Sequence, residues 1–259
     1  MKNRSLFVHF AKEEHAFVER AFDWVRKALA HDIVTTPFLD PRERDILESL
    51  VNREQDLLVQ SQGGAPHAER QRVVLAPDYV VDIPLEKFGL TFFRVLTERE
   101  TELKHPDVLG ALLGLGIRRD KLGDIYSTKE GADLVVASEL KGFFLTELQQ
   151  IGRERIRIEE IEMDELSKQL EETEEKSVTV SSLRIDVVLS AAHRLSRTLS
   201  TSMVKSGKAK LNWRIVEDPS TLVNEGDMLS LRQYGRIRIS AIEGTTKKGR
   251  VILKISSFN

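Results

Sequence analysis

The chain has 259 residues, a length that suggests about two domains or three small ones, and its composition, 41% hydrophobic and 31% charged, is sufficient for ordinary globular cores. It contains no cysteine, so disulfide bonds, thiolate catalysis and cysteine-ligated metal sites are excluded. No apolar run approaches the roughly 18 residues of a membrane-spanning helix, and charged residues interrupt the apolar patch that follows the basic start. We therefore expect a cytoplasmic protein without a signal peptide or a membrane partner.

The net charge of −2 conceals an uneven distribution along the chain. Residues 181–259 carry 14 Lys and Arg against 6 Asp and Glu, a net charge of +8. Residues 1–180 carry the remaining 25 Lys and Arg and 35 Asp and Glu, a net charge of −10. A basic domain on an acidic body concentrates affinity for polyanions at one end of the chain. A chance imbalance of solvated charges is the alternative, and the motifs of the basic segment argue against it.

Residues 1–68 are expected to form a mainly helical N-terminal domain. Apolar residues recur at helical spacing over residues 10–29. A second helix is expected to begin with Asp40 as its N-cap and Pro41 in its first turn. The segment groups no residues with catalytic chemistry, so it is interpreted as scaffold.

Residues 69–162 are expected to form a central domain in which strands and helices alternate. Runs of β-branched and aromatic residues predict strands at 73–76, 80–85, 90–95, 125–126, 134–137 and 156–161. Apolar faces predict helices over residues 106–115 and 139–151. This interleaving predicts a compact α+β domain of ferredoxin-like or RRM-like type. Residues 163–180, which include the acidic run 171–175, are expected to be an exposed, partly helical linker.

Residues 181–259 are expected to form a separate basic domain. A short helix follows residue 183, and a second helix runs from Ser196 as N-cap to a stop at Gly207. Alternating residues then predict strands at 208–213, 214–216 and 228–231, and a hairpin with a basic tip that joins 236–240 to 251–255.

The basic domain supplies the residues that are expected to contact RNA: Arg184, Asp186, Arg194, Arg197, Thr198, Lys205, Lys208, Lys210, Asn212, Arg232 and Arg236. Arg197 and Lys205 are eight residues apart, which places them about two turns apart on one helical face. Lys208 and Lys210 alternate onto one side of a strand. Such a surface suits phosphates along an RNA backbone, because Arg and Lys supply charge and donors without demanding sequence. A solvated cation remains the alternative for each single residue, and Asp186 is better suited to partnering a nearby arginine or backbone amide.

A second basic cluster, Arg118, Arg119 and Lys121, lies in the central domain and is expected to add RNA contacts. The glycines at 114 and 116 do not form a dinucleotide-binding loop, because the third glycine is missing and a helix precedes them. The six histidines show no metal-type pairing, and no phosphate-binding loop is present. We therefore expect no catalytic residue, no cofactor, no metal and no small-molecule substrate.

The basic segment, from Leu-Arg-Ile-Asp at 183–186 to Arg238, resembles the alpha-L RNA-binding domain, which also occurs in pseudouridine synthases and tyrosyl-tRNA synthetases. The whole chain resembles the bacterial YlmH family of ribosome-associated RNA-binding proteins. Besides the C-terminal domain, the resemblance rests on Thr-Pro-Phe-Leu-Asp-Pro-Arg at 36–42, Gly-Gly at 63–64 with Glu-Arg-Gln-Arg at 69–72, Leu-Lys-His-Pro-Asp-Val-Leu-Gly at 103–110, and Gly-Leu-Gly-Ile-Arg-Arg-Asp-Lys-Leu-Gly-Asp-Ile at 114–125.

The resemblance implies a helical N-terminal part, an RRM-like centre and a C-terminal alpha-L domain. It also implies binding to tRNA and the large ribosomal subunit, and a role in quality control after ribosomes stall. Our leading hypothesis is a non-enzymatic, monomeric factor that binds rRNA and tRNA. The alternative is an RNA-modifying enzyme of pseudouridine synthase type, although residues 70–160 look too short for its catalytic domain. An adaptor whose acidic body binds a basic ribosomal protein is compatible with the first hypothesis.

Overall fold

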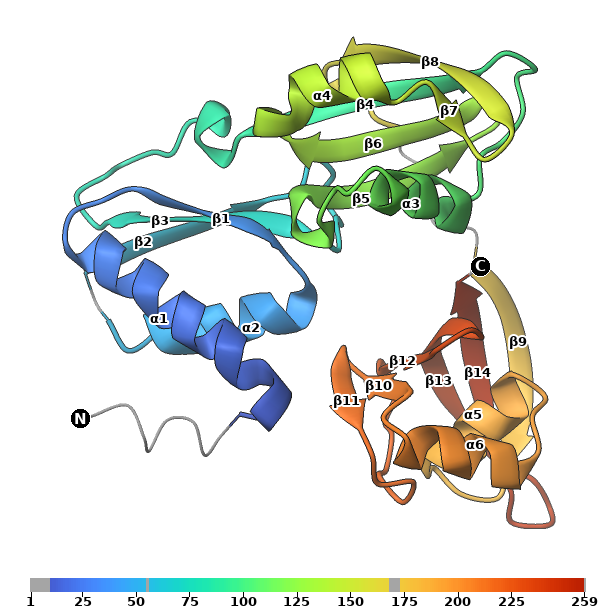
Figure 1. Ribbon diagram of the computed structural model, residues 1–259. Helices are drawn as coiled ribbons and strands as arrows, with labels where there is room; N and C mark the ends of the chain where they lie inside the picture. Colours follow the sequence, from blue (N-terminus) through green and yellow to red (C-terminus); the bar gives the residue numbers. More distant parts are fainter. Residues whose placement is uncertain (1–9, 55, 168–172, 259) are drawn as a thin grey trace. The chain divides into compact units, whose positions relative to one another are not determined.

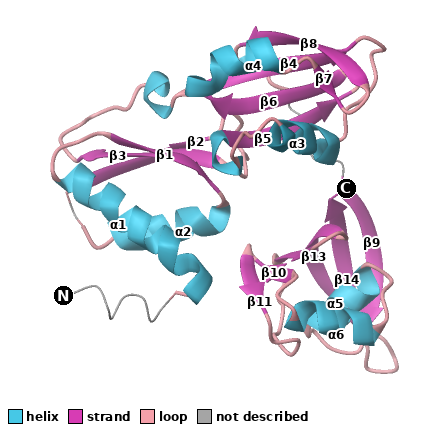
Figure 2. Cartoon of the chain, in the orientation of Figure 1, coloured by secondary structure: helices cyan, strands magenta, loops and turns pink. Residues whose placement is uncertain are grey.

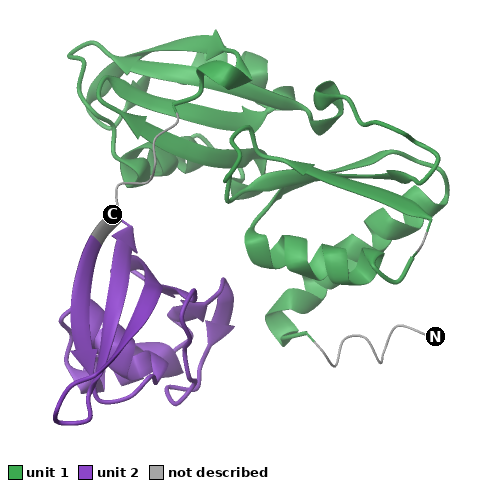
Figure 3. Ribbon diagram, turned by 180° about the vertical axis from the view of Figure 1, so that it is seen from behind, with its two compact units in different colours: residues 1–169 green, residues 170–259 purple. Residues whose placement is uncertain are grey.

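The computed structural model describes residues 10–54, 56–167 and 173–258. The chain divides into two compact units, residues 1–169 and 170–259 (Figure 3). Helices and antiparallel sheets occur in both units (Figure 2), which confirms the expected α+β class.

The N-terminal part of the first unit is a three-stranded sheet with two helices on one face (Figure 1). Its elements are η2 (Lys12–Glu14), α1 (His15–Leu29), β1 (Val34–Leu39), α2 (Pro41–Val51), β2 (Leu57–Gln62) and β3 (Gln71–Pro77). Both predicted helices are confirmed. Asp40 accepts the N–H of Glu43 at 2.8 Å, and the Glu43 carboxylate accepts the N–H of Asp40 at 3.0 Å. This reciprocal capping fixes the start of α2.

Strands β1 and β2 occupy segments of the N-terminal part that the sequence suggested to be irregular or helical. β1 contains Pro37, which it tolerates because β1 lies at the edge of the sheet order β1-β3-β2 and its register shifts between Thr35 and Phe38. β3 lies between the other two strands and is almost completely buried. The expected start of the central domain at residue 69 therefore falls before a strand that belongs to the N-terminal sheet. Strand partners are set by tertiary contacts, which a local pattern does not contain.

The central part of the first unit is a five-stranded antiparallel sheet in the order β5-β6-β4-β8-β7. Its elements are η3 (Leu85–Phe88), β4 (Leu90–Thr97), α3 (His105–Gly114), η4 (Arg119–Lys121), β5 (Leu122–Thr128), β6 (Gly131–Ala137), η5 (Ser138–Leu140), α4 (Lys141–Glu147), β7 (Gln150–Ile151), β8 (Glu154–Ile161) and η6 (Met163–Glu165). Apart from the two-residue strand β7, the succession β4-α3-β5-β6-α4-β8 is the β-α-β-β-α-β ferredoxin-like connection that the sequence predicted. Helices α3 and α4 cover one face of the sheet (Figure 1).

Two central predictions were wrong in detail. The expected strand at 80–85 is irregular, and Pro84, which has no backbone N–H, precedes η3. The expected helix 139–151 is confined to α4, because Gln150 and Ile151 pair with β8 across the turn at Gly152.

The opposite face of the central sheet is covered by the chain itself. Phe38 of β1 and Leu166 pack with Phe92 and Val135 in one apolar cluster. Arg94 donates to both carboxylate oxygens of the buried Asp133 at 3.0 Å. The backbone N–H and the hydroxyl of Ser167 complete the shell of Asp133 at 2.8 and 2.7 Å. The segment after β8 is thereby tied down as far as residue 167.

The second unit is a six-stranded antiparallel sheet with two helices, ordered β11-β10-β12-β13-β14-β9. Its elements are β9 (Thr173–Val180), α5 (Ile185–Ala192), α6 (Arg197–Lys205), β10 (Ala209–Leu211), β11 (Arg214–Val216), β12 (Met228–Leu231), β13 (Gly235–Thr245) and β14 (Val251–Phe258). Apolar residues of α5 and α6 pack on one face of the sheet to form its core. Both predicted helices and the predicted hairpin are confirmed, and Ser196 accepts the N–H of Leu199 at the start of α6.

The end of the expected linker 163–180 is a strand. β9 pairs with β14 over eight residues, from Thr173 opposite Phe258 to Val180 opposite Val251. Val178 packs against the core and Val180 is buried in it, and this burial outweighs the charge of the preceding residues. Residues 168–172, which include the start of the acidic run, lie outside the described residues.

Candidate nucleic-acid interface

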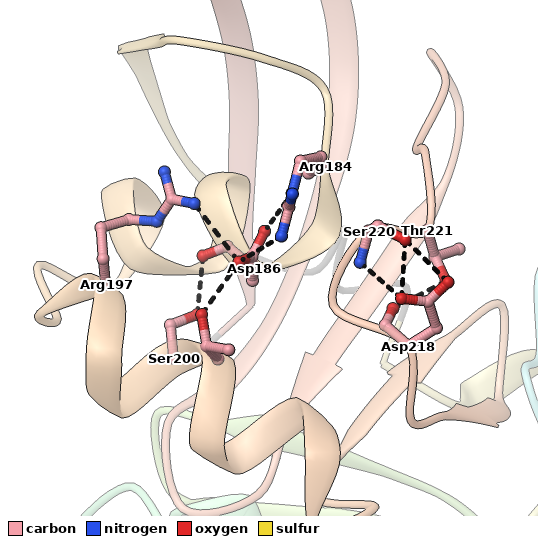
Figure 4. A network of polar contacts seen from close by, with 8 residues as sticks. Arg184, Asp186, Arg197, Ser200, Asp218, Ser220 and Thr221 are labelled. Atoms are coloured by element: carbon pink, nitrogen blue, oxygen red, sulfur yellow. Dashed lines mark hydrogen bonds and ion pairs between the residues drawn. The ribbon is translucent and has the colours of Figure 1, made fainter.

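The aspartate at the start of α5 organises the cationic residues around it. Arg184, the N-cap residue of α5, donates from Nε and Nη2 to the two carboxylate oxygens of Asp186, each at 3.1 Å (Figure 4). Arg197, in the first turn of α6, donates to the same carboxylate at 3.3 Å. Thr201 and Ser200 of α6 donate to its carboxylate and its backbone carbonyl, at 2.9 and 2.7 Å. One aspartate thus joins both helices and two arginines.

This carboxylate is buried while its arginine partners reach solvent. The side chain of Asp186 is 2% exposed, against 41% for Arg184 and 49% for Arg197. Burial alone would raise the pKa of Asp186, but hydrogen bonds from Arg184 and Thr201 and the arginine charges outweigh it and lower that pKa. Asp186 therefore stays ionised and holds two guanidinium groups with their outer sides available. As the sequence indicated, it is a structural partner of an arginine.

A neighbouring loop holds the start of α5 in place. The Asp218 carboxylate accepts the N–H and the hydroxyl of Ser220 at 2.9 and 2.7 Å (Figure 4). The N–H of Ile185 donates to the carbonyl of Thr221 at 2.8 Å, and Arg184 forms a β-bridge with Leu222. Arg184 is thus fixed through its backbone as well as its side chain.

The remaining predicted residues of the helical pair lie at its surface. Arg194 has a left-handed backbone (φ 55°) in the turn between α5 and α6 and is exposed. Thr198 in the first turn of α6 and Lys205 at its end are also exposed.

The other predicted cations belong to the sheet. Ala209 is buried between the exposed Lys208 and Lys210, so both lysines point away from the core, as predicted. The N–H of Arg232 donates to the carbonyl of Lys208 at 3.0 Å, which brings Lys208 and Arg232 together. Lys210 lies opposite Ser230, and Ser230 lies opposite Arg236. The predicted residues therefore form two groups, one around α5 and α6 and one on the outer sheet face.

Asn212 is held by its own unit. It occupies the turn between β10 and β11 with φ 47°. Its side-chain NH2 donates to Asp227 at 2.8 Å, and its side-chain oxygen accepts the N–H of Met228 at 2.9 Å. These bonds give Asn212 a structural role in the turn.

The second predicted cluster, in the first unit, is engaged in local contacts. Arg118 forms an ion pair with Asp120, and Lys121 donates to Glu139 at 2.6 Å. Arg119 donates to the backbone carbonyls of Leu122 and Gly123 at 2.9 and 3.2 Å. Arg119 thus stabilises the start of β5, while Arg118 remains exposed.

Four residues of the second unit were not among those predicted from the sequence. Ser200 and Thr201 bind Asp186, and Arg238 and Phe258 lie beside Arg236 on the outer sheet face. The alternation Arg236-Ile237-Arg238 could have revealed Arg238, because it places both arginines on one face. Among the described residues, no group of three or more His, Asp or Glu side chains could hold a metal ion. The described helices are too short or too polar to cross a membrane.

A basic unit in which an Arg-Ile-Asp helix start joins two helices on a twisted sheet defines the S4 class of RNA-binding domain, and residues 183–229 match the S4 domain model. Residues 13–80 match the model for the N-terminal part of YlmH, and residues 85–165 match that for an RNA-binding domain in YlmH. The chain belongs to the YlmH family.

A curated relative supports this membership along nearly the whole chain. The "Ribosome-associated protein quality control protein P2" of Bacillus subtilis (strain 168) is 38% identical over 250 residues, which cover 95% of each chain. A solved structure, "Cell division protein ylmH from Streptococcus pneumoniae", superposes with a TM-score of 0.55 at 25% identity. It covers 61% of this chain and 98% of that one.

Proposed function

We propose that this protein is a non-enzymatic, cytoplasmic RNA-binding factor that binds rRNA and tRNA on the large ribosomal subunit. We further propose that it acts in ribosome-associated quality control of stalled nascent chains, the activity for which the Bacillus relative is named. The observation that carries the proposal is the buried Asp186, which presents Arg184 and Arg197 together on the basic segment 181–259, whose net charge is +8. Fixed guanidinium groups suit phosphate oxygens, because less side-chain freedom is lost on binding.

Two aspartates of the first unit bear on the alternative of a pseudouridine synthase. Asp133 is completely buried under Arg94 and Ser167. Asp124 accepts the backbone N–H groups of Glu69 and Arg70 at 2.6 and 3.1 Å. Both carboxylates thus hold the fold together, which favours the binding factor. Mass spectrometry of rRNA from a deletion strain tests the alternative, since a modification lost and restored by the wild-type gene would establish an enzyme.

The direct test is co-sedimentation of the full chain with purified large subunits. The variant R197Q/K205Q/K208Q removes three cations, with glutamine at Arg197 so that no second carboxylate faces Asp186. The matched control K27Q/R53Q/K87Q removes three exposed cations of the first unit and changes the net charge equally.

We expect the first variant to leave the subunit fraction and the control to remain in it. The salt dependence of binding should also flatten, by roughly one unit of log K per log salt for each lost phosphate contact. Equal co-sedimentation of the two variants would show that these cations do not carry binding. Thermal melts of both variants establish that they are folded.

A further inference from the structure

We propose that the outer face of the second unit's sheet, on the side away from α5 and α6, is a separate surface for single-stranded RNA. In this proposal an unpaired base stacks at Phe258 while neighbouring cations hold the phosphates. The inference rests on the proposed function, since it requires that the unit binds RNA. Beyond the proposed function, it assigns the second unit a second RNA-binding face, which prefers unpaired RNA.

Strand register places a row of side chains across this face. Ile215 lies opposite Lys210, Lys210 opposite Ser230, Ser230 opposite Arg236, and Arg236 opposite Phe258. Directly opposed residues of antiparallel strands point to the same side of a sheet. Their neighbours Leu229, Leu231 and Ile237 point to the other side and are buried in the core with α5 and α6.

Two arginines and an aromatic ring meet at the end of this row. The guanidinium carbons of Arg236 and Arg238 lie 5.7 and 5.5 Å from the centre of the Phe258 ring. Arg238 is exposed, and Phe258 is half-buried. The acidic Glu175 on the same face binds Lys254 at 2.7 Å, so its charge is locally compensated. The combination of a ring with cations is the one that binds unpaired nucleotides.

Shape separates this surface from the cations around Asp186. A duplex hides the faces of its bases in the stack, so an aromatic ring on an open sheet face offers it little. A single strand can place a base against Phe258 and its phosphates near Lys210, Arg236 and Arg238. Because the two surfaces lie on opposite sides of the sheet, one unit could hold two RNA segments at once.

Fluorescence anisotropy with the full chain tests the proposal. The probes are a labelled oligoadenylate of about 12 nucleotides and an RNA duplex of about 16 base pairs. F258L, which keeps apolar bulk without a ring, should weaken oligoadenylate binding at least about fivefold, and F258W should restore it. R236Q/R238Q should weaken it and lower the salt slope by about 0.7 for each cation removed.

Control variants separate this surface from the other one. K27Q/R53Q, two exposed cations of the N-terminal part, should bind both probes like the wild type. R197Q/K205Q should lose duplex affinity and retain most oligoadenylate affinity. F258L and R236Q/R238Q should leave duplex binding unchanged, and thermal melts show whether each variant is folded.

The outcomes that overturn the inference differ from those that overturn the proposed function. Wild-type binding of the duplex without the oligoadenylate, or unchanged oligoadenylate affinity in both outer-face variants, would refute the second surface alone. A loss in R236Q/R238Q without one in F258L would refute base stacking and reduce the face to a charged patch. Failure of the wild type to bind either probe would refute RNA binding itself.

Discussion

Replacing Asp124 by asparagine should change how the stability of the first unit depends on pH. Burial raises the pKa of Asp124 to about 6, although the N–H groups of Glu69 and Arg70 favour its ionised form. Against the ordinary value of 3.8, this difference corresponds to about 3 kcal/mol. The folded chain binds this proton more tightly than the unfolded chain does. The contribution is therefore fully present below about pH 4 and is lost as the pH rises through about 6.

When the pH is lowered from about 7 to about 5, protonation of Asp124 should increase the free energy of unfolding of the wild type by roughly 1 kcal/mol. Urea unfolding can be followed through Trp24 of α1, in a W213F background that removes the tryptophan of the second unit. D124N never ionises and offers one acceptor oxygen in place of two. The substitution should therefore change the free energy of unfolding by an amount to which residue 124 itself adds no pH dependence. Glu43, whose pKa is also raised by burial, titrates in both proteins and cancels in the difference.

The result that would refute this reasoning is an equal pH slope in the two proteins. It would mean that Asp124 reaches enough water to ionise without a penalty. A steeper wild-type loss of stability with rising pH confirms a buried carboxylate that links the loop before β3 to β5.

Three further predictions concern single contacts. Ser196→Ala removes the acceptor for the N–H of Leu199 and should lower the free energy of unfolding of the second unit by about 1 kcal/mol, measured with the fluorescence of Trp213. Ser196→Asp keeps an acceptor at this position and should retain most of that stability. Asp186→Asn should lower the melting temperature of the second unit and weaken duplex RNA binding, because it releases Arg184 and Arg197; unchanged values in both assays would contradict its organising role. Gly131→Ala should cost more than about 3 kcal/mol or prevent folding, because the added Cβ would meet the carbonyl oxygen of Val95, and a near-wild-type melt would disprove that close approach.

Local sequence signals predicted the elements that local chemistry determines. Asp40 and Ser196 were recognised as N-caps because capping uses residues within one turn of chain. The hairpin of β13 and β14 and the β-α-β-β-α-β order also followed from alternation and turn residues.

Non-local partners explain what the sequence did not reveal. β9 was hidden by its acidic residues, and its partner β14 lies more than 70 residues later in the chain. The strand at 73–76 was correctly predicted but grouped with the central domain, because a run of β-branched residues does not specify the neighbours of a strand. From the sequence, Arg119 and Asn212 were predicted to contact RNA. In the structure, Arg119 donates to the carbonyl of Leu122 and Asn212 accepts the N–H of Met228, contacts that the fold creates.

The position of β14 has a consequence for how the second unit forms during synthesis. β14 is made last among the six strands, yet it lies inside the sheet, between β13 and the first strand, β9. While the chain is still emerging from the ribosome, β9 therefore has no hydrogen-bonding neighbour in the sheet. Val180 in β9 reaches its core position only after Val251 has been released. The second unit should consequently close in one late step, and a nascent chain stopped before β14 would leave β9 and one edge of β13 open to pairing with other chains.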